Sequence, residues 1–175
     1  MKLNRRNFIS ASAGIAATIS SPMVFGASRP KVVVIGGGAG GATAARYIAK
    51  DSKGAIDVTL VEPTRSYYTC FFSNLYLGGF RDFDSIGHSY GKLASDYGIN
   101  VVHDWAVDVD SSGKTVSLAG GGTVNYDKLI LSPGIDFVDN SVPGWDLSSQ
   151  NKMPHSYKAG SQTQLLNAQI ENMRQ

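Results

Sequence analysis

A glycine-rich segment near the start of the chain has residues suited to binding phosphate groups. It reads Gly36-Gly37-Gly38-Ala39-Gly40-Gly41 and contains the spacing G-x-G-x-x-G. In this motif the first glycine permits a tight turn, the second lets backbone N–H groups approach a pyrophosphate, and the third allows a helix to pack closely on a strand. A helix that begins here also directs a partial positive charge at the phosphates. The segment predicts a dinucleotide site at Gly36, Gly38, Ala39 and Gly41.

An acidic residue, Glu62, follows Gly41 by 21 residues. A carboxylate at the end of a second strand accepts hydrogen bonds from both hydroxyls of an adenosine ribose and repels a 2′-phosphate. We therefore expect FAD or NAD rather than NADP, with Pro63 beside Glu62 in the site. The alternative is a glycine turn followed by a solvated glutamate.

Two strands and a helix must position these residues. The apolar run 31–35 is typical of a strand buried on both faces of a parallel sheet. Residues 42–50 are expected to be helical, and 56–61 to form a second strand that ends at Pro63. Together they make a βαβ unit of the expected length.

The pattern after this unit favours FAD over NAD. An NAD dehydrogenase usually continues with further parallel strands and crossover helices, whereas residues 65–87 are aromatic-rich and expected to be irregular. The remaining expected elements are a helix at 93–97, a third strand within 100–109, an antiparallel hairpin of 106–109 with 115–118, short strands at 123–126 and 128–131, and a helix at 161–175. The predicted fold class is α/β: a Rossmann-like FAD-binding domain with a small antiparallel insertion.

The last expected strand ends in Ser132-Pro133-Gly134. This segment resembles the second FAD signature of flavoproteins with two dinucleotide-binding domains, in which an apolar strand ends in Ala-Thr-Gly. Ser132 and Gly134 are therefore predicted to lie near the flavin, and Val107 of the hairpin is added to the predicted cofactor-binding residues. The alternative is a strand that merely ends in a turn.

Cys70 is the single cysteine of the chain. It excludes an internal disulfide, an internal CxxC pair and a zinc site built from several thiolates, and no metal site is expected. A lone cysteine is usually a small buried hydrophobic residue, but a thiol after the second strand of an FAD domain can reach the flavin's 8α-methyl group and form a thioether. The histidines at 88, 103 and 155 are interpreted as scaffold or surface residues.

Residues 1–27 have the composition of an export signal. They hold three basic residues and no acidic one, followed by a short run of small and apolar residues. Asn4-Arg5-Arg6-Asn7-Phe8-Ile9 resembles a twin-arginine motif, which predicts export to the periplasm with cofactor bound; an ordinary secretory signal is the alternative. The whole chain carries a net charge of +2, and without 1–27 the balance is 13 basic to 14 acidic residues. Neither a nucleic-acid partner nor a stable membrane span is expected.

Several longer stretches resemble the flavoprotein subunit of flavocytochrome c sulfide dehydrogenase. They include Val58-Thr59-Leu60-Val61-Glu62-Pro63, Tyr67-Tyr68-Thr69-Cys70 and Met153-Pro154-His155-Ser156-Tyr157-Lys158-Ala159-Gly160. In that family the corresponding cysteine carries covalent FAD, so the resemblance implies this role for Cys70. Tyr157 stands where a tryptophan is expected, and Phe71-Phe72 also departs from the family pattern.

The resemblance implies a larger enzyme that oxidises sulfide and passes electrons to a cytochrome c subunit. In that family a pair of redox-active cysteines lies beyond the equivalent of Gln175, so no catalytic residue is expected in this chain. The expected organisation is a signal peptide at 1–27, the N-terminal part of an FAD-binding domain at 28–160, and a helix at 161–175 leading to a second dinucleotide-type domain before which the chain is truncated. The alternatives are a sulfide:quinone oxidoreductase, another FAD-dependent NAD(P)H/disulfide reductase, or a non-catalytic nucleotide-binding remnant.

Overall fold

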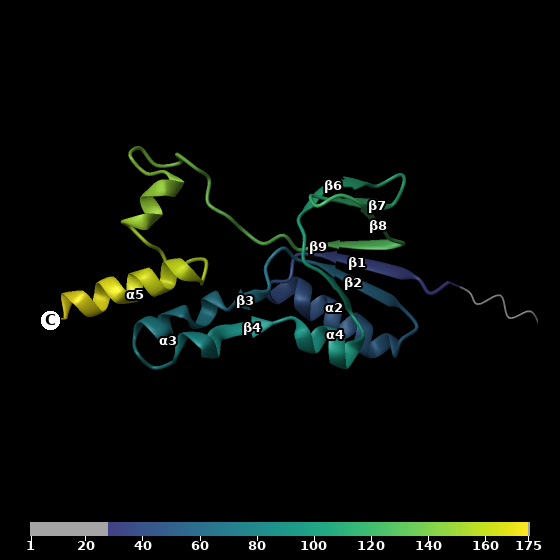
Figure 1. Ribbon diagram of the computed structural model, residues 1–175, viewed down its shortest axis with the longest axis horizontal. Helices are drawn as coiled ribbons and strands as arrows, with labels where there is room; N and C mark the ends of the chain where they lie inside the picture. The colour runs from purple at the N-terminus through teal and green to yellow at the C-terminus, as the bar shows by residue number, and fades with distance from the viewer. Residues whose placement is uncertain (1–27, 175) are drawn as a thin grey trace, which may run out of the picture.

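The computed structural model describes residues 28–174, and its main sheet, called the central sheet below, has four parallel strands and lies on the right in Figure 1. The export signal expected over 1–27 lies outside the described residues. The strands are β1 (Lys31–Ile35), β2 (Asp57–Val61), β5 (Asn100–Val102) and β9 (Lys128–Leu131), in the order β5-β2-β1-β9. Val33 of β1 stands opposite Thr59 on one side and Leu129 on the other. This arrangement confirms the predicted α/β fold class and the βαβ unit.

One face of the sheet packs against two helices, α2 (Ala39–Ser52) and α4 (Gly91–Tyr97) (Figure 1). Ala45 and Ala49 of α2 pack in one buried cluster with Val34 and Leu60 of the sheet. Small alanine side chains allow the helix to lie close to the strands. The helix begins three residues earlier than predicted, at Ala39, because the glycines at 40 and 41 belong to its first turn.

A three-stranded antiparallel sheet contributes to the core on the other face. Its strands are β6 (Ala106–Asp110), β7 (Thr115–Leu118) and β8 (Thr123–Asn125). Val116 of β7 is fully buried with Val33 and Val61 of the central sheet. The predicted hairpin is therefore confirmed, and it packs on the sheet that presents the glycine loop.

Two strands occupy the range 100–109, which agrees with the third strand and the first hairpin strand expected there. β5 ends at Val102 and β6 begins at Ala106. Between them Asp104 turns the chain: its carboxylate accepts hydrogen bonds from the backbone N–H groups of Trp105 at 2.7 Å and Gly120 at 3.0 Å. This turn takes the chain out of the parallel sheet and into the antiparallel one.

The aromatic segment 65–87 is also more regular than expected. It contains β3 (Ser66–Tyr68), the 3-10 helix η1 (Cys70–Phe72), α3 (Ser73–Leu77), the 3-10 helix η2 (Phe83–Ile86) and the first residue of β4 (Gly87–Ser89), which pairs with β3. Phe83 stacks on Tyr68 with ring centroids 4.7 Å apart and meets Tyr76 edge-on at 5.2 Å. Side-chain packing between positions distant in sequence forms these short elements, so local pattern did not reveal them.

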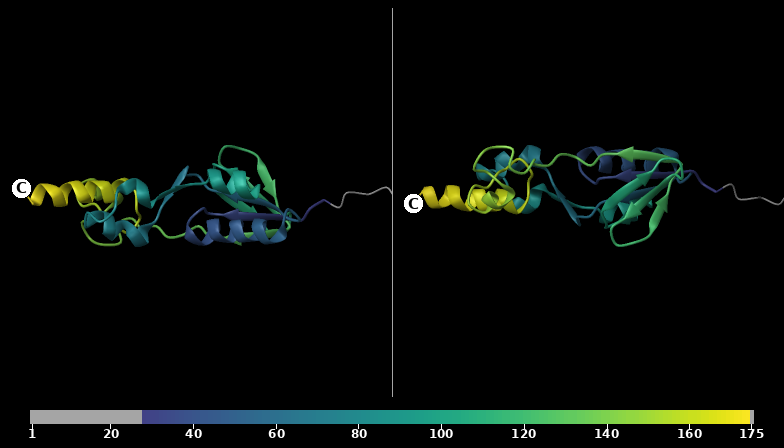
Figure 2. Two further views of the ribbon diagram at one scale, coloured as in Figure 1. Left: turned by 90° about the horizontal axis from the view of Figure 1, so that it is seen from below. Right: turned by 90° about the horizontal axis from the view of Figure 1, so that it is seen from above.

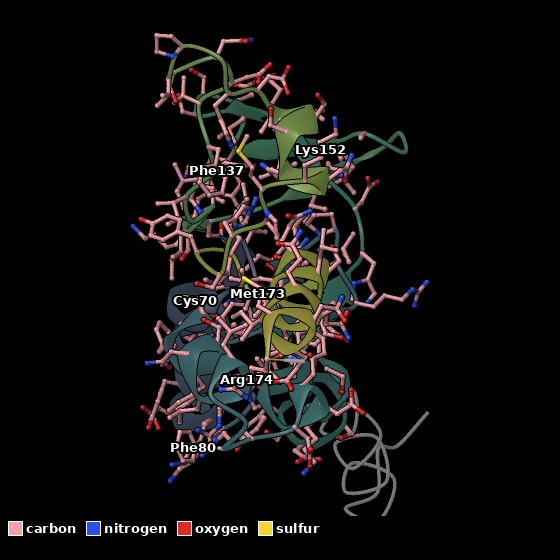
Figure 3. All side chains as sticks on the ribbon, turned by 90° about the vertical axis from the view of Figure 1, so that its left-hand side faces the viewer. Cys70, Phe80, Phe137, Lys152, Met173 and Arg174 are labelled. Carbon is pink, nitrogen blue, oxygen red and sulfur yellow. The ribbon has the colours of Figure 1, made fainter. Side chains whose placement is uncertain are left out.

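The C-terminal part is a long connection followed by a helix. After β9 come the 3-10 helix η3 (Leu147–Asn151) and α5 (Ser161–Met173), the helix predicted over 161–175. Figure 2 shows α5 beside the α3 segment, far from the sheet. Figure 3 views this end of the molecule, where Cys70, Phe80 and Met173 are found. None of the helices within 28–174 is long and apolar enough to cross a membrane.

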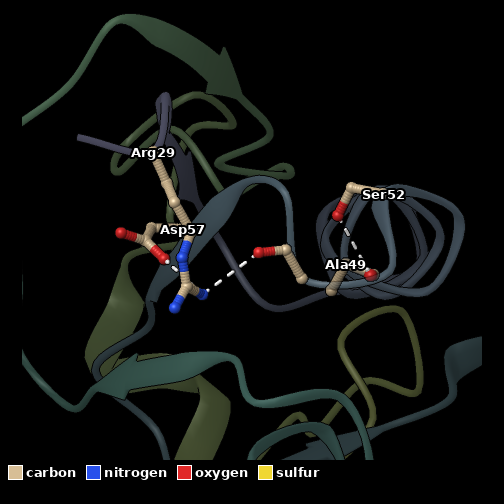
Figure 4. Close-up of polar contacts among 5 residues, drawn as sticks. Arg29, Ala49, Ser52 and Asp57 are labelled. Carbon is tan, nitrogen blue, oxygen red and sulfur yellow. Dashed lines mark hydrogen bonds and ion pairs between the residues drawn. The ribbon is translucent and has the colours of Figure 1, made fainter. Parts of the chain in front are cut away.

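At the opposite end, Arg29 holds the return of the chain from α2 to β2 (Figure 4). Its guanidinium donates a hydrogen bond to the Gly54 carbonyl oxygen at 3.1 Å and lies 3.3 Å from an Asp57 carboxylate oxygen. Lys53 ends the helix in a left-handed conformation, with φ 51°. Arg29 thus contacts the first residue of β2, Asp57, which stands opposite Lys31 in the sheet.

Candidate dinucleotide-binding site

The predicted site residues meet at the carboxyl edge of the parallel sheet. The ladder of backbone hydrogen bonds continues past the strand ends: Gly36 N–H donates to the Val61 carbonyl at 2.9 Å, and Ser132 N–H donates to the Ile35 carbonyl at 2.8 Å. Loops that follow neighbouring parallel strands are where open α/β sheets bind ligands. The fold thus brings the glycine loop, Glu62 and Ser132 to one edge.

Two of the three motif glycines are required by close contacts. Gly36 has φ +97°, and a Cβ there would collide with the Ser132 carbonyl oxygen; a Cβ at Gly41 would collide with the Gly36 carbonyl oxygen. Gly38 differs, because the nearest atom to a Cβ there would be a Tyr67 ring carbon at 3.8 Å. Gly36 and Gly41 therefore fix the turn and the helix contact, and Gly38 leaves space over the loop for a ligand.

The start of α2 is suited to phosphate oxygens. Gly38 is the N-cap residue, no side chain caps the helix, and its first turn holds no acidic residue. Burial and the neighbouring Cys70 thiol raise the pKa of Tyr67, while the Ala39 backbone lowers it. The Tyr67 ring lies near Gly38, so this side chain borders the glycine loop.

Glu62, half-buried after β2, is held by three hydrogen bonds. Its Oε2 accepts one from the Gly37 backbone N–H at 2.7 Å. Its Oε1 accepts two from Thr64, one from the backbone N–H at 2.9 Å and one from Oγ1 at 2.7 Å. Sequence reasoning missed Thr64, although an acid followed two residues later by threonine is a recognisable pattern for a local side-chain turn.

Tyr90 lies beneath the loop and was also missed. Its side chain is 5% exposed, and its hydroxyl donates a hydrogen bond to the Gly37 carbonyl oxygen at 3.1 Å. Burial and, secondly, the Glu62 charge raise the pKa of Tyr90 to about 12. His103 lies beside it, ring centroids 5.9 Å apart, with Nδ1 3.1 Å from the Glu62 carbonyl oxygen. His103 is thus hydrogen-bonded scaffold, as predicted.

The other predicted cofactor-binding residues are placed as follows. Pro63 is half-buried next to Glu62, and Ser132 lies against the glycine loop. Gly134 has φ +78°, which its turn requires of a glycine. Val107 lies on β6 with its side chain 61% exposed. The roles of Val107 and Gly134 toward a cofactor stay predictions.

Cys70 opens η1 and has a free, half-buried thiol. Its carbonyl oxygen accepts a hydrogen bond from Ser73 Oγ at 2.7 Å, and the same hydroxyl lies 3.3 Å from the Ser156 carbonyl oxygen. Ser156 of the segment 153–160 therefore lies close to the turn that holds Cys70. A covalent role for the thiol stays a prediction.

These features fit the ADP part of a dinucleotide. The glycine loop and the uncapped helix start offer backbone donors to a pyrophosphate, and Glu62 offers a carboxylate at the end of the neighbouring strand. All of the residues that would contact the ADP part belong to this chain.

Comparison with known proteins agrees with this geometry. The chain is 31% identical over 105 residues to the sulfide-quinone reductase of Aquifex aeolicus, covering 59% of this chain and 24% of that protein. It is 54% identical over 44 residues to the sulfide dehydrogenase (flavocytochrome c) flavoprotein chain of Chlorobaculum thiosulfatiphilum, covering 25% of this chain and 90% of that sequence. The solved sulfide:quinone oxidoreductase of Aquifex aeolicus superposes with a TM-score of 0.69 at 22% identity, over 83% of this chain and 32% of that one.

The family assignment depends on the longest of these matches. Residues 30–170 match the pyridine nucleotide-disulphide oxidoreductase family. The chain spans about a quarter of the curated sulfide-quinone reductase and about a third of the solved oxidoreductase. The loop, the helix start and the acid at the sheet edge are thus those of a flavin-dependent oxidoreductase: the chain belongs to the pyridine nucleotide-disulphide oxidoreductase family, and this membership implies FAD as the cofactor.

Proposed function

We propose that this chain is the FAD-binding part of a sulfide dehydrogenase that passes electrons from sulfide, through covalently bound FAD, to a cytochrome c subunit. The observation that carries the proposal is the 54% identity over 44 residues to a sulfide dehydrogenase flavoprotein chain. The family match and the dinucleotide site at the sheet edge support it. Bound FAD supplies the redox chemistry, accepting electrons in pairs and releasing them singly.

The residues of this chain would bind and orient that cofactor. The loop from Gly36 to Gly41 would hold the pyrophosphate and Glu62 the adenosine ribose. Ser132 and Gly134 would lie along the diphosphate and ribityl side. The half-buried Cys70 would attach the flavin through a thioether to the 8α-methyl group. Tyr67 supports this placement, because it lies three residues before Cys70 in the chain and its ring borders Gly38 of the loop.

Covalent attachment would suit an exported enzyme, because a cofactor lost outside the cytoplasm is not replaced there. We propose export by the twin-arginine route and a periplasmic location, supported by the arginine pair and the small, apolar residues that follow it. A single cysteine cannot form a redox-active pair. The sulfide-oxidising cysteines of the complete enzyme are therefore proposed to come from another part of the protein.

The covalent link can be tested on the full chain reconstituted with FAD. After acid precipitation, we expect the yellow colour to stay with the protein and the flavin mass to be found on the peptide that contains Cys70. The Cys70→Ser variant should release all of its flavin, while the control Phe71→Leu, altered at an exposed neighbour, should retain it. Free flavin from the unaltered chain, or a Cys70→Ser protein that stays yellow in acid, would contradict the assignment.

A sulfide:quinone oxidoreductase is the second candidate. The 31% identity over 105 residues to the Aquifex sulfide-quinone reductase favours it. The electron acceptor separates the two functions. With the complete protein and sulfide, rapid reduction of cytochrome c and slow reduction of a soluble quinone analogue would support the sulfide dehydrogenase, and the reverse order would support the quinone enzyme.

A further inference from the structure

We propose that Thr64 and Tyr90 are positioning residues for the adenosine ribose: together they fix the Glu62 carboxylate and the backbone of Gly37 so that a single carboxylate site faces the nucleotide. The glycine motif that predicted the site includes neither residue. The inference rests on the dinucleotide site of the proposed function, but not on the covalent link or on sulfide as substrate.

The hydrogen bonds to Glu62 limit what a ribose can find there. A carboxylate has about four acceptor sites, two on each oxygen. Both sites on Oε1 are taken by Thr64, through its backbone N–H at 2.9 Å and its Oγ1 at 2.7 Å. Oε2 has one bond, from Gly37 N–H at 2.7 Å. One site therefore remains, on Oε2, so the carboxylate as it stands accepts one ribose hydroxyl rather than the two expected from the sequence.

The Thr64 hydroxyl holds the carboxylate in this orientation. Thr64 Oγ1 donates its single proton to Glu62 Oε1, the nearer acceptor at 2.7 Å, and the Ser66 carbonyl oxygen lies farther away at 3.2 Å. Without the hydroxyl, Glu62 would keep the backbone contacts but gain rotational freedom. Oε1 would then be open to a second hydrogen-bond donor or to solvent.

Tyr90 acts on the other side of the same loop. Its hydroxyl donates to the Gly37 carbonyl oxygen at 3.1 Å, and a Cβ on Gly37 would lie 2.6 Å from that hydroxyl oxygen. The backbone of Gly37 is therefore held on both sides, since Tyr90 binds the carbonyl of the peptide that follows it and Glu62 binds the N–H of the peptide that precedes it. Because these two peptides share the Gly37 Cα, the phenol limits the φ and ψ rotation that would turn the N–H away from Glu62 Oε2.

A fixed carboxylate binds its ligand more tightly, because no side-chain freedom is lost on binding. It also discriminates more strongly. A 2′-phosphate brought to a rigid carboxylate meets like charge, whereas a mobile carboxylate can turn away. The two residues should therefore determine affinity for ADP and, separately, the preference for ADP over its 2′-phosphorylated form.

The test measures the dissociation constants of ADP and 2′-phospho-ADP by calorimetry on the full chain, with urea unfolding in parallel. We expect Thr64→Val and Tyr90→Phe each to weaken ADP binding about 3- to 10-fold. Thr64→Val should also lower the ratio of ADP to 2′-phospho-ADP affinity, and Thr64→Ser should restore both values. Matched controls are Thr123→Val, at an exposed strand position, and Tyr126→Phe, whose hydroxyl bonds the Asp110 carbonyl in the antiparallel sheet.

The outcomes are separable. Unchanged ADP affinity in Thr64→Val and Tyr90→Phe would overturn the inference, as would lower stability with unchanged affinity and ratio, since that is what a purely structural role produces. Failure of the unaltered, folded chain to bind ADP would overturn the dinucleotide site itself. A Thr64→Ser variant that behaves like Thr64→Val would show that the hydroxyl is not the positioning group.

Discussion

The two ends of the molecule are stabilised in different ways. Every buried hydrophobic residue of the described chain lies between Val32 and Val116, and all of them except Ile86 of η2 belong to the two clusters that pack on the parallel sheet. In residues 135–174, beyond the strand β9, only Thr163 is buried, and six apolar side chains are more than half exposed. These are Ile135, Val138, Val142, Met153, Tyr157 and Met173. Regions with few buried apolar contacts open at lower free energy than the global unfolding.

Local polar contacts organise the C-terminal region instead of a core. The Asp146 carboxylate caps η3 through the Ser149 N–H at 2.8 Å. Lys158 pairs with Asp136 at 2.8 Å on an exposed surface, where such pairs contribute little. The Phe137 and His155 rings lie 4.4 Å apart. The end that holds the sheet and the glycine loop (the nucleotide end) is therefore stabilised by burial. The C-terminal region is stabilised by polar and ring contacts outside a core.

Removing one leucine from each region should give the largest difference. Leu60 is 0% exposed in the sheet, and Leu147 is 47% exposed in η3. Leu60→Ala should lower the free energy of unfolding by roughly 2–5 kcal/mol, because it leaves a cavity, whereas Leu147→Ala should change it by less than about 0.5 kcal/mol. Urea denaturation followed by circular dichroism measures both. Equal losses would contradict the contrast between the two regions.

A second comparison separates close contact from backbone strain at the nucleotide end. Gly36 and Gly121 have nearly the same φ, +97° and +92°, but only Gly36 has neighbours that a Cβ would strike. Gly36→Ala should cost roughly 2–4 kcal/mol and abolish ADP binding. Gly121→Ala should cost roughly 1 kcal/mol and leave binding intact. Similar effects on ADP binding would show that conformation, and not packing, explains the glycine.

Alkaline pH should affect the nucleotide end through Tyr90. Its pKa is raised to about 12, so between pH 10 and 12 the folded protein keeps a proton that the unfolded chain has lost. The stabilisation from this buried phenol is present below pH 10 and is lost as the pH rises to 12. Tyr90→Phe should remove this loss, a difference on the order of 1–2 kcal/mol, in urea denaturation series at pH 9 to 12. If the free energy of unfolding had the same pH dependence in both proteins, this role of Tyr90 would be excluded.

Mild acid should act on the C-terminal region, with the smallest effect. Burial, and then the Lys158 charge, lower the pKa of His155 from 6.5, against the opposing effect of Asp136. Below pH 6.5 the unfolded chain therefore binds a proton that the folded chain resists. Stability should fall as the pH drops from 6.5, and less so in His155→Phe. Thermal unfolding between pH 7.5 and 5 measures this, and an identical slope in the variant would refute it.

The sequence pattern predicted those features of the structure that depend on residues close together in the chain. The buried run of β1, the glycine turn and the acid after β2 were all recognised, since strand burial and the spacing of Gly36, Gly38 and Gly41 impose one local geometry. The hairpin β6–β7 was recognised for the same reason. By contrast, the short elements between Ser66 and Ser89 were missed, because stacking such as that of Tyr68 on Phe83 forms them.

The sequence by itself determined the parallel-sheet fold, the glycine turn and the acid after β2, because hydrophobic periodicity and glycine conformation depend on adjacent residues. Only the tertiary structure decided how that acid is held. Tyr90 reaches Gly37 across 53 positions of sequence, and Thr64 leaves Glu62 a single open acceptor site. Such contacts depend on packing between α4, the glycine loop and β2, which no local pattern records.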